Sequence, residues 1–220
     1  MKTVSSIVEN YIKNKPFLLT GLSQGIINLT SLSRNMMQEL SVDFPKDVKQ
    51  GAIVMALKRL TIDLDFRINN RILRVLKNIG EITVRSSLCD YTFVISNTIL
   101  DKQAELITQI KPFQDVFYTS SRGVSETNIM VSESVSLMVE KLFEAEKLLL
   151  KLPNLASITV KLPQDNVSTP GLYYYIFQRL AWEGIVINQV ISTSNEFTIL
   201  VADDQVELAF GIIKDLKKIV

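Results

Sequence analysis

The hydrophobic positions of residues 1–79 repeat with the period of α-helices. Apolar side chains recur every three or four residues in Val4–Lys13, in Leu29–Leu40 and again in Phe66–Ile79. Asn28 is a typical N-cap residue for the second of these segments. A longer helix is predicted from Lys46 onward, because Asp43-Phe44-Pro45 interrupts the preceding pattern. We therefore expect a helical amino-terminal domain.

Two of these segments, Thr30–Leu40 and Lys46–Leu60, have the outline of a helix-turn-helix. The cations that could contact nucleic acid in this region are Lys46, Lys49, Arg67, Arg71 and Arg74. Two interpretations remain open for them. They form a surface that contacts phosphates, or they form a basic helix face that packs against an acidic part of the chain.

From Gly80 onward the hydrophobic pattern changes to the alternation of β-strands. A hairpin is predicted around Cys89-Asp90, followed by a helix, a strand pair and a second helix. The expected elements are the strands Glu81–Leu88 and Tyr91–Ser96, the helix Thr98–Ile110, the strands Asp115–Ser120 and Glu126–Val131, and the helix Ser134–Leu150.

The same element order then returns. It comprises the strand Ala156–Leu162, the helix Gly171–Glu183 ended by Gly184, the strands Ile185–Ser192 and Phe197–Val201, and the helix Gln205–Lys218. A repeat of roughly 70 residues indicates two copies of one small domain. The predicted domains are residues 1–79, 80–150 and 151–220.

The amino-acid composition excludes several classes of function but does not identify one. The 220 residues contain no histidine and one cysteine, Cys89. Histidine-based catalytic triads, histidine zinc motifs and an intrachain disulfide are thereby excluded, so an enzyme is disfavoured and no cofactor is expected. No apolar run has the length of a membrane span, which predicts a cytoplasmic protein without a membrane partner. Residues 1–80 carry 12 Lys/Arg against 6 Asp/Glu, whereas residues 81–220 carry 12 against 17.

The segment Leu162–Val201 holds the most specific chemistry. Its polar loop leads into a Pro-Gly helix start, where unpaired backbone N–H groups and the positive end of the helix dipole converge. Such a place is suited to a small anionic ligand. The alternative is a surface loop without a ligand.

This segment also resembles a known family. The pieces Gln164–Gly171 (QDNVSTPG), Gly184–Asn188 (GIVIN) and Ile191–Ile199 (ISTSNEFTI) are similar to ACT domains, small βαββαβ modules that bind amino acids, and above all to the regulatory tail of aspartate kinases. The first copy resembles the family in Thr119–Val131, but Ser96-Asn97-Thr98 lacks the Pro-Gly start. Nothing in the chain resembles the kinase domain. The resemblance implies an α+β chain with two tandem ACT-like, ferredoxin-type domains after the helical domain.

The resemblance further implies an amino-acid ligand between paired ACT domains. At the matching positions, a carboxylate and an amide stand before the helix, Thr169 or Ser168 would cap it, and backbone groups of the following strand would complete the site. The expected ligand-binding residues are Asp165, Asn166, Thr169, Gly171, Leu172, Ile187, Asn188 and Gln189.

The predicted function is therefore that of an amino-acid-sensing regulator, acting as a homodimer or a higher homo-oligomer, with DNA as a candidate partner of the helical domain. Two alternatives stay open: a regulatory subunit of a biosynthetic enzyme such as an aspartate kinase, and an oligomerisation module that binds no ligand.

Overall fold

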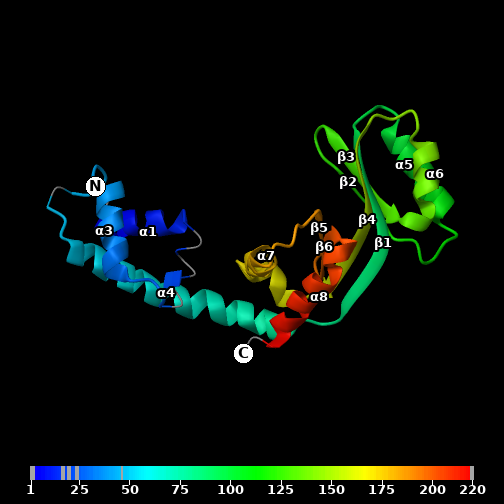
Figure 1. The fold of residues 1–220 in the computed structure, drawn as a ribbon. Helices are drawn as coiled ribbons and strands as arrows, with labels where there is room; N and C mark the ends of the chain where they lie inside the picture. Colours follow the sequence, from blue (N-terminus) through cyan, green and yellow to red (C-terminus); the bar gives the residue numbers. More distant parts are fainter. Residues whose placement is uncertain (1–2, 16–17, 19–20, 23–24, 46, 219–220) are drawn as a thin grey trace. The chain divides into compact units, whose positions relative to one another are not determined.

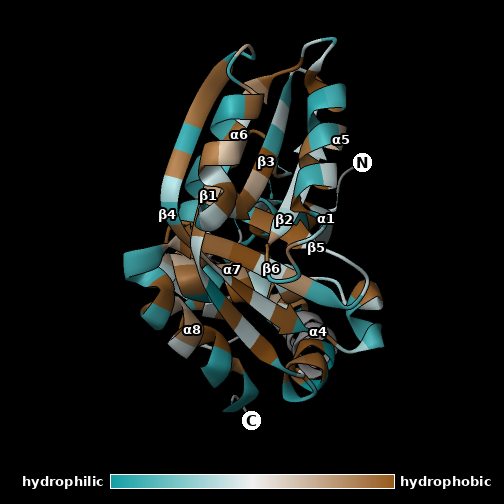
Figure 2. Cartoon of the chain, turned by 90° about the vertical axis from the view of Figure 1, so that its right-hand side faces the viewer, coloured by the Kyte–Doolittle hydropathy of each residue, from teal (hydrophilic) through white to brown (hydrophobic). Residues whose placement is uncertain are grey.

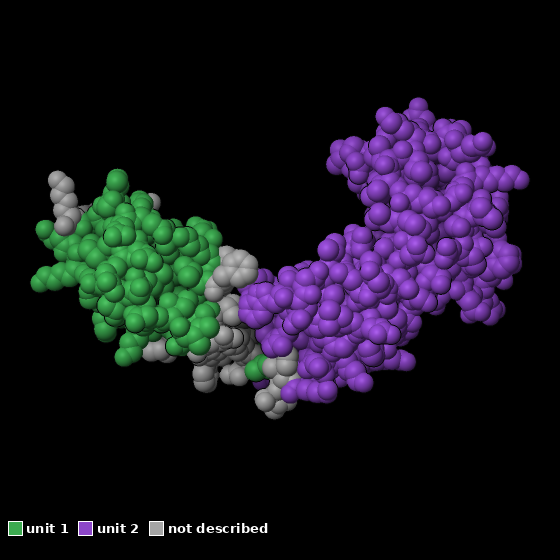
Figure 3. Space-filling model, viewed as in Figure 1, with its two compact units in different colours: residues 1–73 green, residues 74–220 purple. Residues whose placement is uncertain are grey.

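The computed structural model describes residues 3–15, 18, 21–22, 25–45 and 47–218, and it describes residues 62–70 by their backbone alone. The described chain divides into two compact units, residues 1–73 and residues 74–220, which Figure 3 colours separately. The boundary between them lies within one helix, α4 (Gln50–Lys77).

The first unit is built from α-helices, as the apolar period predicts. Helix α1 (Val4–Lys13) begins at Thr3, whose side chain accepts a hydrogen bond from the Ser6 backbone N–H at 3.2 Å. Asn28 caps α3 (Leu29–Glu39) in the same way, with 3.0 Å between its Oδ1 and the Ser31 nitrogen. The predicted N-cap at Asn28 is confirmed. The buried core of this unit comprises Ile7, Val8, Ile12, Leu22, Leu32, Met36, Phe44, Ile53, Ala56 and Leu57.

The helix-turn-helix prediction is not confirmed. Helix α3 ends at Glu39 and α4 begins at Gln50, so residues 40–49 connect them. This connection is longer than the three- or four-residue turn of a helix-turn-helix. Lys46 lies outside the described residues, and the side chain of Arg67 lies outside them too.

The second unit is an α+β structure around one antiparallel sheet, which confirms the α+β part of the predicted fold class. Its strands lie in the order β2-β3-β1-β4-β6-β5. They are β1 (Ile82–Val94), β2 (Tyr118–Arg122), β3 (Glu126–Ser132), β4 (Leu148–Lys161), β5 (Gln189–Ser192) and β6 (Glu196–Ala202). In Figure 1, β1 and β4 run as two long strands through both halves of this unit.

The helices cover the sheet in two pairs. Helices α5 (Ile99–Ile110) and α6 (Ser136–Leu142) pack on the half that contains β2 and β3. Helices α7 (Leu172–Trp182) and α8 (Val206–Asp215) accompany the half that contains β5 and β6. Figure 2 shows brown segments along β4 and β6, whereas α5 alternates brown with teal, as expected for a helix with one buried face.

The long strands correct two predictions. The expected hairpin at Cys89-Asp90 is wrong, because β1 continues through both residues as one strand. Cys89 is buried in the core rather than placed on a turn, and burial raises the pKa of its thiol. The helix predicted over Ser134–Leu150 ends at Leu142, and the residues from Leu148 onward belong to β4. The predicted helix end at Gly184 is confirmed, with φ of +74°.

Each long strand serves both halves of the sheet. Residues 88–94 of β1 pair with β3, and Ile82–Arg85 pair with residues 157–160 of β4. The far half of β4, from Leu155 to Lys161, pairs with β6. Each half of the sheet therefore contains part of β1 and part of β4. The strands lie in the order β2-β3-β1-β4 in one half and β5-β6-β4-β1 in the other, so the two halves are built alike.

The backbone has an unusual conformation where β1 and β4 pass from one half of the sheet to the other. Ser87 and Asn154 both have φ of +57°, and among the described residues no other non-glycine residue has positive φ. Each directly precedes a member of the Leu88–Leu155 pair, and the register of β1 against β4 shifts on both sides of Leu88. The left-handed residues thus mark the point where each strand leaves one half of the sheet for the other.

We expect Ser87→Gly to stabilise the protein by about 0.5–1 kcal/mol. Glycine removes the strain of a side chain in the left-handed region, although it adds some entropy to the unfolded chain. Asn154→Gly should gain less, because asparagine tolerates this conformation better than serine. Chemical denaturation measures both effects.

Ser86→Gly is the matched control, because Ser86 lies in the same strand without positive φ. It should destabilise the protein by about 0.5–1 kcal/mol. Equal losses for Ser86→Gly and Ser87→Gly would contradict strain at Ser87.

Candidate functional site

The loop before α7 is ordered by its own hydrogen bonds. After β4 the chain forms a short 3₁₀ helix, Gln164–Ser168. The hydroxyl of Thr169 donates to the Asp165 carbonyl oxygen at 2.8 Å, and that of Ser168 donates to the same oxygen at 3.2 Å. The Asp165 side chain is exposed at the surface of this loop. The backbone of the loop is therefore fixed while a carboxylate remains accessible to solvent.

Asn166 joins this loop to the turn between β5 and β6. Its side chain is buried, with 6% exposed, and its Nδ2 donates to the carbonyl oxygens of Pro163 at 2.7 Å and of Ser194 at 2.8 Å. Both amide hydrogens of Asn166 are thereby used within the protein. This residue positions the loop, and only its Oδ1 remains as a group that could accept from a ligand.

The start of α7 differs from the prediction in its cap. Gly171 is the N-cap residue, with φ of +84°, and no side chain caps the first turn. The prediction that Thr169 or Ser168 caps the helix is wrong, because the N-cap residue is Gly171 and neither hydroxyl accepts a cap hydrogen bond; both donate to the Asp165 carbonyl oxygen. A glycine N-cap leaves the first N–H groups of α7 without a capping side chain, which keeps them available to an anion. Leu172, the first residue of the helix, is buried.

The remaining predicted ligand residues lie at the other end of β5. The Asn188 backbone N–H donates to the Leu200 carbonyl oxygen at 2.8 Å, and the Asn188 side chain is exposed, whereas Ile187 is half-buried. Gln189 begins β5, and Ser194, the partner of Asn166, follows its end. A strand advances about 3.3 Å per residue, so these two ends are separated by on the order of 15 Å. Within one chain the predicted site is divided into two groups.

A polar cluster that the sequence did not reveal joins the two halves of the sheet. Gln189 Nε2 donates to Asn128 Oδ1 at 2.9 Å, although β5 and β3 are not neighbours in the sheet. Asn128 Nδ2 donates in turn to Asp90 Oδ1 and, at 3.3 Å, to Thr92 Oγ1. The three strands are far apart in sequence, and Asp90 had been assigned to a turn, so no local pattern could indicate this contact.

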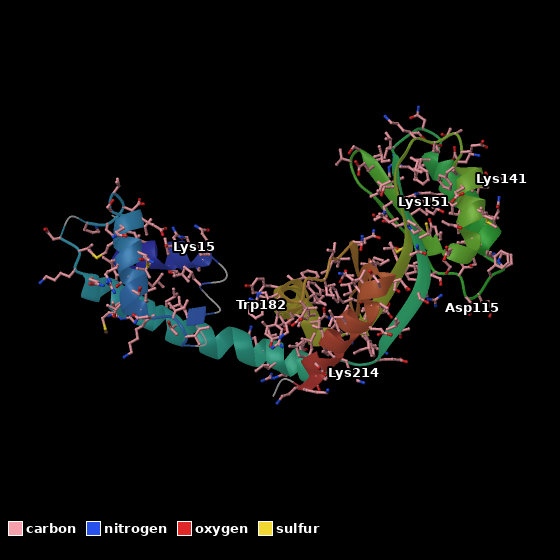
Figure 4. All side chains as sticks on the ribbon, viewed as in Figure 1. Lys15, Asp115, Lys141, Lys151, Trp182 and Lys214 are labelled. Carbon is pink, nitrogen blue, oxygen red and sulfur yellow. The ribbon has the colours of Figure 1, made fainter. Side chains whose placement is uncertain are left out.

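The Asp90 carboxyl is the most perturbed acid of this cluster. It is 6% exposed, and burial raises its pKa, against the opposing hydrogen bonds from Asn128 and from the Tyr91 backbone N–H. Nearby on the opposite face, Glu140 accepts from Lys151 at 2.7 Å and from the Tyr91 hydroxyl at 3.1 Å. Lys151, labelled in Figure 4, and Tyr91 lower the pKa of Glu140 through these bonds. The partners of Glu140 thus stabilise its charged form, whereas burial destabilises the charged form of Asp90.

The basic residues of the nucleic-acid hypothesis are exposed where they are described. Lys49 precedes α4, and Arg71 and Arg74 lie on it, all three at the surface. Arg74 also accepts a hydrogen bond on its carbonyl oxygen from the Asn78 side chain at 2.9 Å. Exposure is compatible with phosphate contacts and with an ordinary solvated helix face alike.

The described residues offer few other kinds of site. Among them, no group of three or more acidic or cysteine side chains could hold a metal ion. No described helix combines the length and apolar character needed to cross a membrane.

The chain resembles known proteins in its fold. No family model matches the chain, and no curated protein matches its sequence. Among solved structures, the regulatory subunit of aspartate kinase from Thermus thermophilus superposes with a TM-score of 0.52 at 12% identity, covering 63% of this chain and 97% of that subunit. The regulatory subunit from Thermus flavus gives the same values. Aspartate kinase from Clostridium acetobutylicum gives a TM-score of 0.51 at 15% identity, over 63% of this chain and 34% of that enzyme.

Over 63% of this chain, the fold is that of an aspartate kinase regulatory region. The resemblance found in the sequence is confirmed at this level. The matched regulatory subunits are covered almost completely, so the match includes no kinase domain. More than a third of this chain lies outside the match.

We expect Asn166→Ala to destabilise the protein by about 1–3 kcal/mol, because it removes the side-chain donor of the Ser194 carbonyl oxygen and one of the two donors to the Pro163 carbonyl oxygen. Asn188→Ala is the control, since the Asn188 side chain is exposed. Urea denaturation of both variants measures the difference. A loss for Asn166→Ala no greater than that of the control would mean that the loop is held in another way.

We expect Asp90→Asn to stabilise the protein near neutral pH by roughly 1–2 kcal/mol. A carboxyl with a raised folded-state pKa contributes stability below its unfolded pKa and loses it as pH rises through the folded pKa. Asparagine stays neutral and still accepts from Asn128, so the gain of the variant over the natural protein should grow with pH above about 4.

The measurement is the free energy of unfolding of both proteins between pH 4 and 8. Glu140→Gln is the control of opposite sign, because the pKa of Glu140 is lowered. A gain for Asp90→Asn that shrinks as pH rises would contradict the assignment.

Proposed function

We propose that this chain is an amino-acid-sensing regulatory protein and not an enzyme. The observation that carries the proposal is the superposition of its fold on nearly the whole of an aspartate kinase regulatory subunit. The polar loop and uncapped helix start of α7 lie within the segment whose sequence resembles ACT domains. The fold resembles that of a regulatory subunit, and the N–H groups at the helix start are suited to a carboxylate. Both features support an amino acid as the ligand.

We further propose that the sheet contains two ACT-like, ferredoxin-type repeats that are interleaved. The first repeat is β1, α5, β2, β3, α6 and β4, which places its strands in the sheet order 2-3-1-4. The second is β4, α7, β5, β6 and α8, with the first residues of β1 in the place of its fourth strand. This arrangement amends the tandem division at residues 80–150 and 151–220, because Ile82–Arg85 then belong to the second repeat.

The proposed ligand site needs a second copy of the chain. The exposed Asp165 carboxylate is suited to a ligand ammonium group, and the N–H groups at Gly171 and Leu172 are suited to its carboxylate. The residues Ile187, Asn188 and Gln189 lie at the far end of β5 of the same chain. Because β5 is an outermost strand, its free backbone edge can pair with another copy. Pairing would bring the two groups together from different chains in a homodimer or a larger homo-oligomer.

We propose two alternative targets on which the bound ligand acts. In one, the ligand acts on the basic helical segment that contains α4, where exposed Lys49, Arg71 and Arg74 would contact DNA. In the other, the chain acts in trans on a biosynthetic enzyme, as a separate regulatory subunit. Retention on duplex DNA that falls steeply with salt supports the first, and co-purification with an enzyme without such retention supports the second.

We expect one or a few of the twenty amino acids to raise the melting temperature. A ligand at about 100 times its Kd stabilises the folded state by about 2.7 kcal/mol, which is a clear shift in thermal unfolding. The shift should disappear in Asp165→Ala, because this variant removes the partner proposed for the ligand ammonium group.

Glu183→Ala is the matched control, because Glu183 is an exposed carboxylate at the other end of α7. It should keep the full shift. A flat response of the natural protein to every amino acid would leave the oligomerisation module as the surviving alternative.

A further inference from the structure

The contact between Gln189 and Asn128 closes the sheet on itself. Three strands separate β5 from β3 in the sheet order, yet the two side chains are hydrogen-bonded at 2.9 Å. The sheet must therefore curl until its two halves meet face to face. The chain of bonds continues from Asn128 to Asp90 on β1, so one polar line runs from the second half into the first.

An apolar cluster lies beside this line. Leu88, Met130, Leu155 and Leu200 are buried together, with Phe117, Leu152 and Ile191 packed against them. Met130 is the register partner of Asp90, and Leu200 is the register partner of Gln189. The apolar cluster and the polar line thus occupy the same junction between the halves. Burial of the cluster favours the closed sheet.

The polar line itself is poorly satisfied when the sheet is closed. Gln189 Oε1 is shut off from solvent and has no hydrogen-bond partner in the described residues. Asp90 is buried as well, with 6% exposed. A buried acceptor without a donor and a buried carboxyl both disfavour the closed state, and water would satisfy both groups if the halves separated. At the junction, burial of the apolar cluster thus favours the closed sheet, whereas the two buried polar groups disfavour it. An element with two alternative states requires such a balance.

We propose that Gln189, Asn128 and Asp90 form a latch between the two halves of the sheet, and that an amino acid bound at Gln189 opens it. The opening of the latch by an amino acid rests on the proposed function. The Gln189 Nε2 has two N–H groups, of which one donates to Asn128, whereas its Oε1 is enclosed without a donor. A ligand that donates to Oε1 can reach it only when the two halves of the sheet separate. Binding at Oε1 and closure are therefore mutually exclusive, so each weakens the other.

The latch is tested first without any ligand, by amide hydrogen exchange of the full chain. Asn128→Leu removes the partner of Gln189 from the first half, so amides of β5 in the second half should exchange severalfold faster than in the natural protein. The control is Gln103→Leu. Gln103 is buried and donates to Thr127, the neighbour of Asn128, so its loss weakens the same strand without touching the latch.

Unchanged exchange in β5 of Asn128→Leu, or equal acceleration in both variants, would overturn the latch. If Asn128→Leu does not fold, Gln189→Leu replaces it, and the exchange of residues 88–94 in the first half is then measured. Faster exchange there supports the latch, and natural exchange there overturns it.

The coupling to a ligand is tested with the amino acid that gives the largest thermal shift. Asn128 is outside the proposed ligand-binding residues, so Asn128→Leu frees Gln189 without removing a ligand contact. Its calorimetric Kd for that amino acid should be about 5-fold or more below that of the natural protein, whereas Gln103→Leu should leave the Kd unchanged. An equal or higher Kd for Asn128→Leu would overturn the coupling. A protein that answers no amino acid refutes the proposed function and the coupling together, while the exchange experiment still decides the latch.

Discussion

The antiparallel pairing of β1 with β4 is the constraint on which the second unit depends. These two strands form the middle of the six-stranded sheet, and every other strand attaches to one of them directly or through a neighbour. Their register is fixed at the Leu88–Leu155 pair, where a left-handed residue precedes each leucine. Because side chains alternate between faces along a strand, an extra residue at this point resets which positions face the helices. The halves can therefore share two strands and still bury separate cores.

The curled sheet shows how apolar and polar contributions are divided in this protein. The leucine and methionine cluster at the junction supplies the favourable burial, whereas the line from Gln189 to Asp90 places a carboxyl and an amide oxygen out of reach of water. Buried polar groups of this kind lower the stability of the closed sheet relative to an apolar junction of the same shape. The loop before α7 follows a different rule, because Asn166 satisfies both of its donors and simply holds the loop in place.

The sequence was informative wherever the cause of structure is local. The cap at Asn28 and the helix end at Gly184 depend on a few adjacent residues, and both were predicted. The hairpin predicted at Cys89-Asp90 is wrong, because both residues pair with β3 and Asp90 also pairs with β4, which keeps them in one strand. The three leucines at Leu148–Leu150 continued a helical spacing, and only pairing with β1 makes them a strand. The Gln189–Asn128 contact spans 61 residues and has no local signature at all. The same holds for the candidate site: the resemblance indicated the loop, but not that the loop and the end of β5 lie apart.

The shared strands also have a consequence for how this chain is made. Residues 82–85 of β1 find their partners only when residues 157–160 have left the ribosome, and β6 cannot attach before then. The first half has all its strands once β4 has been made, whereas the second half also needs β5 and β6, and a chain interrupted between Val94 and Leu148 would leave both halves with an open edge. Contacts this distant in sequence slow folding, because loop closure precedes the gain from pairing. The second half should therefore be the last part of this unit to fold, because its sheet combines the first residues of β1 with strands made after β4.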